Sequence, residues 1–167
     1  FRHLSSPRQK GKAAREMVGE WMGARFDGVE KVAGSGKESS RHGTYYFFVE
    51  GVGRIAVRSS TLHSNPRKGE DKKFVFNQIR DEDYDFLFCL GIAPSDVHAW
   101  LIPKCEIYSS QRMEGDGVKG QHTGKDAKET LWLWIAPDDP QGWLSQWGGT
   151  LEKVERVMEN PAGIEDS

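Results

Sequence analysis

The sequence predicts one α/β domain over residues 1–160, in which a mixed β-sheet is sandwiched by helices, followed by a flexible tail over 161–167. Three observations lead to this expectation. A helical pattern opens the chain, strand patterns fill its middle, and two short helical patterns precede the tail. The 167 residues are 37% hydrophobic and 29% charged, which is the composition of a globular protein rather than of a disordered chain.

The first element is expected to be a helix over residues 8–24. Ser5, Ser6 and Pro7 stand in front of it and suit the start of a helix. Apolar residues recur inside it at helical spacing and would form one buried stripe. That stripe comprises Ala13, Ala14, Met17, Val18 and Trp21.

Strands are expected next, because β-branched, aromatic and alternating apolar residues follow in short runs between glycine-containing and polar turns. The expected strands cover residues 26–32, 44–50, 54–60, 84–92, 97–102 and 130–136. Those at 84–92 and 130–136 are almost continuously apolar, which is typical of strands buried on both faces. Between the strands we expect polar loops at 61–72 and 111–128 and a crossover through 74–80. Short helices are expected at 103–110, 141–147 and 151–159.

The strand at 54–60 alternates in polarity. Ile55 and Val57 are expected to face the core, which leaves Arg54, Ala56 and Arg58 on the opposite side, facing a polar cleft. Arg58 would there either contact DNA or pair with Glu50 or Glu20.

Charge divides the chain into two unlike halves. Residues 1–80 hold 16 Lys and Arg against 8 Asp and Glu, whereas residues 81–167 hold 7 against 17. A basic half of this kind favours a polyanionic partner, and we expect that partner to be DNA.

The two cysteines and the apolar runs indicate the setting of the protein. Cys89 and Cys105 both lie in apolar stretches and are expected to be buried free thiols, typical of a reducing, cytoplasmic compartment. The apolar runs are far shorter than the roughly 20 residues that a membrane span needs. A membrane partner is therefore not expected. A zinc site is not expected either, since the five His residues lack the spacing of metal ligands.

The stretch TYYFFVEGVGRIAVRSS, residues 44–60, resembles the hairpin of the PD-(D/E)XK nuclease superfamily, which includes many restriction endonucleases. The segments FVFNQIRDEDYDFLFCLGIAP and HAWLIPK are similar to the Gln-containing segment and the buried strand that follow in restriction-type members. The resemblance covers residues 8–147 and implies a restriction-endonuclease-like core. In that family, a helix Glu, a hairpin Asp and a (Asp/Glu)-x-Lys triplet hold Mg²⁺ ions that activate water.

Matching this motif to the sequence leaves gaps. Tyr46 stands where the family has its metal-binding Asp, Ala56 replaces the acid of the triplet, and Arg58 replaces the Lys. Glu16 or Glu20 would match the helix Glu. Two metal ligands are thus missing, so the resemblance implies a nuclease-like fold that has lost its metal, binds no cofactor and does not cleave.

An active Mg²⁺-dependent endonuclease with a rearranged site is the alternative. Glu50 would share one Mg²⁺ ion with Glu16 or Glu20, Arg58 would clamp the phosphate, and Gln78 would support the site. In the plainer interpretation, Glu50 is a strand-end charge and the helix acids are solvated.

A phosphate-facing surface is expected whether or not the site is active, because clustered Arg and Lys side chains suit phosphate and guanine contacts. The expected DNA-binding residues are Arg54, Arg58, Arg67, Lys68, Lys72, Lys73, Arg41, His42, Tyr46 and His122. A further basic group, Arg8, Lys10, Lys12 and Arg15, starts the first helix. An aromatic pocket for an extruded base is a bolder expectation, built from Tyr45, Tyr46 and Phe47 with Trp100 or Trp143.

The leading hypothesis is a DNA-binding domain of a restriction or DNA-processing system that recognises its target without cleavage. A protein-interaction module on a nuclease scaffold is the alternative from another functional class. We further expect that the chain is part of a longer protein, whose remainder could hold a separate nuclease domain. A homodimer stays open.

Overall fold

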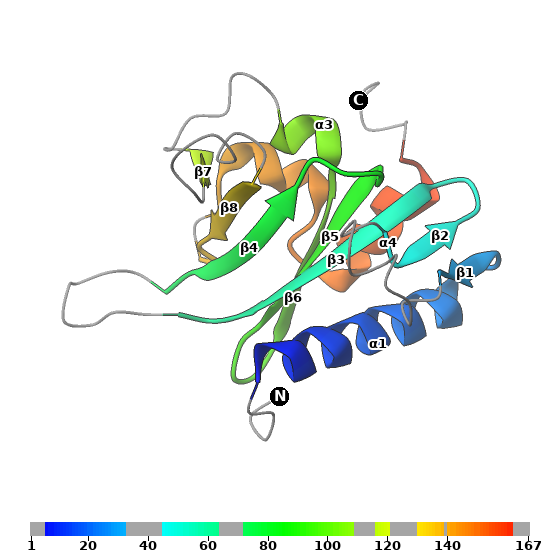
Figure 1. The fold of residues 1–167 in the computed structure, drawn as a ribbon, viewed down its shortest axis with the longest axis horizontal. Coiled ribbons are helices and arrows are strands. Elements are labelled where there is room, and N and C mark those ends of the chain that lie inside the picture. The colour runs from blue at the N-terminus through cyan, green and yellow to red at the C-terminus, as the bar shows by residue number, and fades with distance from the viewer. Residues whose placement is uncertain are drawn as a thin grey trace.

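The computed structural model describes residues 6–32, 45–63, 72–108, 116–120, 130–138 and 140–161 (Figure 1). Within these ranges, eight strands and four helical segments follow one another. They are α1 (Pro7–Arg25), β1 (Val29–Lys31), β2 (Phe47–Val49), β3 (Gly53–Thr61), β4 (Phe74–Arg80), β5 (Phe86–Ile92), β6 (Val97–Pro103), α3 (Lys104–Ile107), β7 (Val118–Gly120), β8 (Thr130–Ile135), the 3-10 helix η3 (Gly142–Trp147) and α4 (Leu151–Glu159).

The main sheet has five strands in the order β1-β2-β3-β5-β6. β1, β2 and β3 are antiparallel neighbours, β3 and β5 run parallel, and β6 returns antiparallel to β5. The predicted α/β class with a mixed sheet is therefore confirmed. β5 is buried over almost its whole length, as its continuous apolar sequence predicted.

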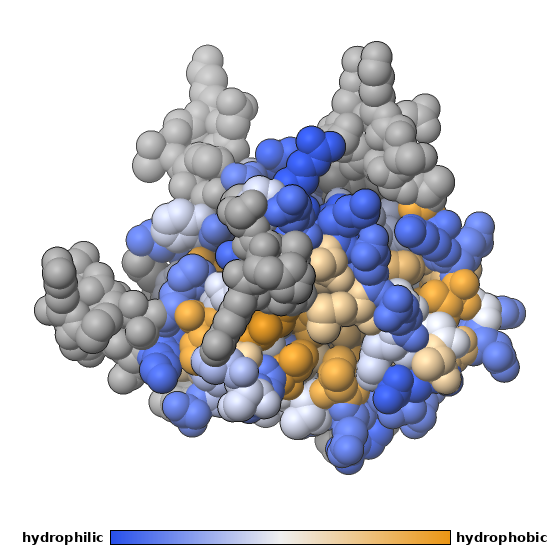
Figure 2. Space-filling view, turned by 90° about the horizontal axis from the view of Figure 1, so that it is seen from below, coloured by the Kyte–Doolittle hydropathy of each residue, from blue (hydrophilic) through white to orange (hydrophobic). Residues whose placement is uncertain are grey.

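α1 begins where the sequence predicted. Ser6 caps it by accepting a hydrogen bond from the Gln9 backbone N–H at 3.2 Å, and Pro7 occupies the first turn. Ala14, Val18 and Met22 form its buried stripe. Met17, which was expected in that stripe, is 41% exposed, and Figure 2 shows such apolar side chains in patches framed by hydrophilic ones.

Different layers cover the two faces of the main sheet. On one face, Trp21 of α1 packs edge-on against Phe88 of β5, and α4 lies beside α1 with an Arg25–Glu155 ion pair of 3.9 Å. On the other face lies a second sheet of order β4-β8-β7, whose Phe74 packs against Trp100 of β6. We expected helices on both faces, so this covering sheet is a difference from the prediction.

The second sheet arises because the chain between β3 and β5 is a strand rather than a simple crossover. The end of β3 contacts the start of β4, where the chain passes from the main sheet to the second sheet. His63 and Lys73 form a bridge there, and the Ser60 hydroxyl accepts from the Val75 N–H at 2.9 Å. β4 then pairs antiparallel with β8. β7, the third strand of this sheet, lies inside the segment that was expected to be a loop.

Two other expectations about burial need correction. Cys89 is buried, but Cys105 lies on α3 and is exposed, because α3 replaces the apolar strand-like environment expected there. β8 contains both buried and half-buried side chains instead of being fully buried. None of the helices in the described ranges combines the length and apolar character that a membrane crossing requires.

Candidate nucleic-acid interface

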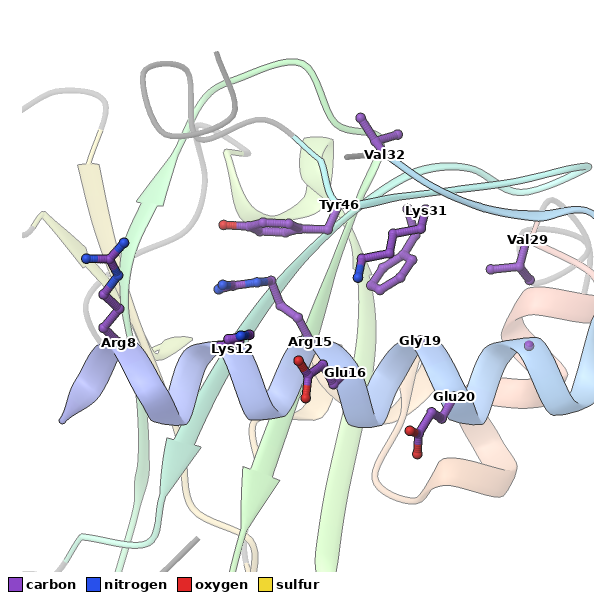
Figure 3. Close-up of a pocket in the computed structure, with 12 residues that line it drawn as sticks. Arg8, Lys12, Arg15, Glu16, Gly19, Glu20, Val29, Lys31, Val32 and Tyr46 are labelled. Carbon is purple, nitrogen blue, oxygen red and sulfur yellow. The ribbon is translucent and has the colours of Figure 1, made fainter. Parts of the chain in front are cut away.

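A groove of about 930 Å³ runs between α1 and the strands β1 and β2 (Figure 3). One wall is the exposed flank of α1, and the other is formed by β1 and the residues around the start of β2. The groove is lined by Arg8, Lys12, Arg15, Glu16, Gly19, Glu20, Gly23, Val29, Lys31, Val32, Tyr46 and Phe47.

Helical spacing divides the groove into two halves. Arg8, Lys12 and Arg15 are four and three residues apart, so they lie on one flank of α1 and make its first half basic. Gly19 and Gly23 continue the same flank, so in the second half this flank has no side chains and Glu20 lines the helical wall beside it. The groove is thus basic at one end and open at the other.

Lys31 and Tyr46 face α1 from the strand wall. In Figure 3 the Nζ of Lys31 points toward the helix, and the ring of Tyr46 extends along the helix with one face toward Arg15. The Arg15 guanidinium lies over the Tyr46 ring, with its Cζ 4.5 Å from the ring centroid, which is the geometry of a cation–π contact. The Tyr46 N–H donates to the Ile55 carbonyl at 2.9 Å, so the main sheet fixes the residue that bears this ring.

Packing explains why the two walls lie at this separation. A Cβ on Gly19 would be 2.9 Å from the Phe47 ring, so only glycine lets α1 approach β2 this closely. A Cβ on Gly23 would meet nothing within 4 Å. Val29 and Val32 are half-buried on the strand wall and give the open end an apolar lining.

Of the three acidic residues of the alternative nuclease site, two line the groove and the third lies outside it. Glu16 and Glu20 line the groove one turn apart on α1, but Glu20 points to the side of the helix away from Tyr46 (Figure 3). Glu50 is outside the groove, beside Gly28 at the far end of β2. The described part of the chain contains no group of three or more His, Cys, Asp or Glu side chains placed to hold a metal ion.

The triplet positions lie on the other face of β3. Ile55 is buried, as expected, and pairs with Phe47 on the α1 face, so Ala56 and Arg58 face the second sheet. The polar cleft expected there is not formed: Ala56 is fully buried, because β4 and β8 cover this face. The structure therefore does not bring Ala56 and Arg58 together with Glu16, Glu20 and Tyr46.

Arg58 binds neither Glu50 nor Glu20. Its Nε and Nη2 donate to the Gln78 carbonyl at 3.3 and 3.0 Å, and its Nη1 donates to the Val57 carbonyl at 2.9 Å. Gln78 lies at a register shift of β4 and has a φ of 57°, a left-handed conformation that is costly for a residue with a side chain. Arg58 thus holds a strained bulge in place.

Arg54 is also engaged inside the protein. Its Nε and Nη2 each donate at 3.1 Å to the Asp85 carboxylate, which also accepts from the Arg54 N–H at 2.8 Å. These hydrogen bonds from Arg54 hold the pKa of the Asp85 carboxyl below its ordinary value. The pair ties the start of β3 to the start of β5.

The remaining predicted residues divide between described and undescribed parts of the chain. Lys72 and Lys73 lie beside the His63 bridge, where β3 and β4 leave the main sheet, and not in the groove. The others, Arg41, His42, Arg67, Lys68 and His122, lie outside the described residues.

The expected aromatic pocket for an extruded base is not assembled. Trp100 is buried between the two sheets, and the Nε1 of Trp143 donates to the Asp116 carbonyl next to β7 at 2.9 Å. Neither residue lines the groove, whereas Tyr46 and Phe47 do. Tyr45 lies near Arg54, whose Cζ is 5.9 Å from its ring centroid.

Some groove residues escaped the sequence analysis. The basic residues that start α1 were identified, but their pairing with Tyr46 was not, and Lys31, Gly19 and Gly23 were missed. The four-residue spacing of Gly19 and Gly23 was a signal that one flank of the helix stays uncovered or closely packed. The chain matches no protein-family model and no curated protein sequence.

Proposed function

We propose that this chain is a DNA-binding domain that holds a sugar-phosphate backbone in the α1 groove. The observation that carries the proposal is that four cationic side chains from two facing walls line one groove: Arg8, Lys12, Arg15 and Lys31. Within the described ranges, the side chains of Arg8, Lys12 and Lys31 make no hydrogen bond or ion pair, so their charges are available to a partner.

The dimensions of the basic half suit a phosphate backbone. From Arg8 to Arg15 the helix rises by roughly 10 Å, and phosphates follow one another every 3.4 Å or so along a strand axis. The stripe therefore spans about three phosphates. If all four cations contact phosphates, log K should fall with log salt concentration with a slope of about −3 on a single strand and about −4 on a duplex.

Recognition without cleavage is part of the proposal. The positions that would supply metal ligands by the PD-(D/E)XK resemblance are Tyr46 and Ala56, neither of which has a carboxylate. The resemblance also supports a place in a restriction or DNA-processing system. Two free cysteines support a reducing, cytoplasmic setting.

Fluorescence anisotropy with a labelled oligonucleotide tests the proposal. The double variant Lys12→Glu/Arg15→Glu should lose at least about tenfold in affinity and show a shallower salt slope. The matched control is Lys153→Glu/Arg156→Glu, which changes the net charge equally on α4 and should bind as the wild type does. Equal losses in both double variants, or none in either, would contradict a groove-based contact.

An active nuclease is the second candidate, because Glu16 and Glu20 line the same groove as the four cations. Carboxylates beside a bound phosphate are the ligands that Mg²⁺ prefers. We expect no cleavage of plasmid DNA with Mg²⁺ or Mn²⁺. Cleavage that disappears in Glu16→Gln or Glu20→Gln would establish the nuclease instead.

A further inference from the structure

We propose that the groove binds an unpaired DNA strand, with a base inserted beside Gly23, rather than an intact duplex. This inference rests on the proposed function and specifies its ligand. It follows from the second half of the groove, which a backbone-binding surface alone would not need.

The Arg15–Tyr46 stack is the first part of the argument. An arginine over an aromatic ring presents a flat, positively charged surface, and both guanidinium planes and aromatic rings are surfaces on which exposed bases stack. The stack stands where the basic half of the groove meets the open half. A base that follows a phosphate held by Lys12 would therefore meet it directly.

The open end supplies space for a base further along the strand, because Gly23 lies eight residues beyond Arg15, a rise of roughly 12 Å along α1. No atom lies within 4 Å of a Cβ position on Gly23, and Val29 and Val32 line the facing wall. An apolar wall that faces an exposed glycine, next to a row of cations, matches a nucleotide, which has an anionic backbone and a largely apolar base face. Glu20, the acid at this level of the helix, points to the side away from Tyr46 (Figure 3).

A closed duplex would use only half of this site. Its base faces are hidden in the stack, so its phosphates could contact the cations but nothing could fill the recess at Gly23. The complementarity of charge at one end and apolar space at the other therefore favours a strand whose bases are unpaired.

Three fluorescein-labelled probes of equal length separate the possibilities: a thymidine strand, the same strand with abasic sites, and a duplex. The thymidine strand should bind about tenfold or more tightly than either of the others, since stacking contributes roughly 1–3 kcal/mol per base. Equal affinity for all three would overturn this inference but leave the proposed function standing, provided that Lys12→Glu/Arg15→Glu still weakens binding. Failure of every probe to bind would remove both.

Two pairs of variants locate the base. Gly23→Leu fills the recess without a clash at its Cβ and should abolish the preference for the thymidine strand over the abasic strand. Its control is Ala24→Leu, which places the same side chain at the next position of the helix, outside the groove. Tyr46→Leu removes the stack and should act like Gly23→Leu, whereas Tyr45→Leu, outside the groove, should keep the preference.

Melting temperatures of all four variants confirm that they fold. An undiminished preference for the thymidine strand in folded Gly23→Leu would overturn the inference. So would an equal loss in Gly23→Leu and Ala24→Leu.

Discussion

The arginines on the two faces of the main sheet differ in how they use their donors. On the α1 face, Arg15 stacks on Tyr46 at the edge of an open groove, and Arg8 lies exposed beside it. On the opposite face, Arg58 gives its donors to main-chain carbonyls, and Arg54 at the sheet end gives its donors to Asp85. The first pair is available to a ligand, whereas the second pair stabilises the fold.

The difference comes from what covers each face. α1 crosses the main sheet with α4 beside it, and a groove remains between the flank of α1 and the strands β1 and β2. The second sheet covers the other face more completely, so a guanidinium there must find partners inside the protein. An arginine of this protein is thus left available or supports the fold according to what packs around it.

The largest expected effect on the free energy of unfolding is that of Arg58→Ala. Loss of the guanidinium leaves the Gln78 and Val57 carbonyls without these donors, so the free energy of unfolding should fall by about 1–3 kcal/mol. Lys12→Ala in the groove should change it by less than about 0.5 kcal/mol. Urea unfolding measures both, and anisotropy should give the reverse order for DNA affinity. Weakened DNA binding by Arg58→Ala with unchanged stability would break the comparison.

The two groove glycines are expected to respond to alanine in opposite ways. Gly19→Ala places a methyl group 2.9 Å from the buried Phe47 ring, and should destabilise the protein by about 1–2 kcal/mol. Gly23→Ala has open space and gains helix propensity, which should stabilise it by up to about 1 kcal/mol. Thermal unfolding of both variants tests this. Equal effects would mean that the groove walls are not fixed by the Gly19–Phe47 contact.

Substitutions of Gln78 test whether the β4 bulge that Arg58 holds stores backbone strain. Gln78→Gly should raise the free energy of unfolding by about 1 kcal/mol relative to Gln78→Ala, because glycine adopts a φ of 57° without the penalty of a Cβ. Both variants lose the 3.3 Å hydrogen bond from Arg80 to the Gln78 side chain, so their difference isolates the backbone. Denaturant unfolding in parallel measures that difference. A glycine variant no more stable than the alanine variant would show that the bulge is unstrained.

The local features of the fold were predictable from the sequence. Ser6 and Pro7 marked the start of α1, and the continuous apolar run of β5 marked a strand buried on both faces. The second sheet was not predictable, because β4 and β8 are distant in sequence and pair only through tertiary packing. Without that sheet, the alternation in β3 predicted a cleft where the protein has a core.

The candidate site divides in the same way. The basic residues of α1 were visible as charges at helical spacing. The contact of Arg15 with Tyr46 could not be predicted, because it depends on the close packing of Gly19 on Phe47. The partner of Arg58 was equally hidden, since the left-handed Gln78 follows from a register shift between paired strands and not from a turn sequence.

The smallest expected effect concerns the pH dependence of the Arg54–Asp85 pair. Because hydrogen bonds from Arg54 lower the pKa of Asp85 in the folded protein, the pair stabilises the fold above the ordinary carboxyl pKa of about 4. This stabilisation is lost as the pH falls through the lower folded pKa. Asp85→Asn should therefore melt roughly 2 to 4 °C below the wild type at neutral pH, a small shift because the carboxylate is 42% exposed.

The decisive measurement for this pair is the melting temperature as a function of pH in the acidic range. The difference between wild type and Asp85→Asn should shrink as the pH falls below about 4, because protonation removes from the wild type the charge that the variant already lacks. Asp138→Asn, an exposed carboxylate after β8, is the matched control and should follow the wild type throughout. A gap between Asp85→Asn and the wild type that stays constant down to strongly acidic pH would mean that the carboxylate acts through its shape and neutral hydrogen bonds. In that case Arg54 would not need its charge for the fold, and the contrast with the groove arginines would rest on Arg58 alone.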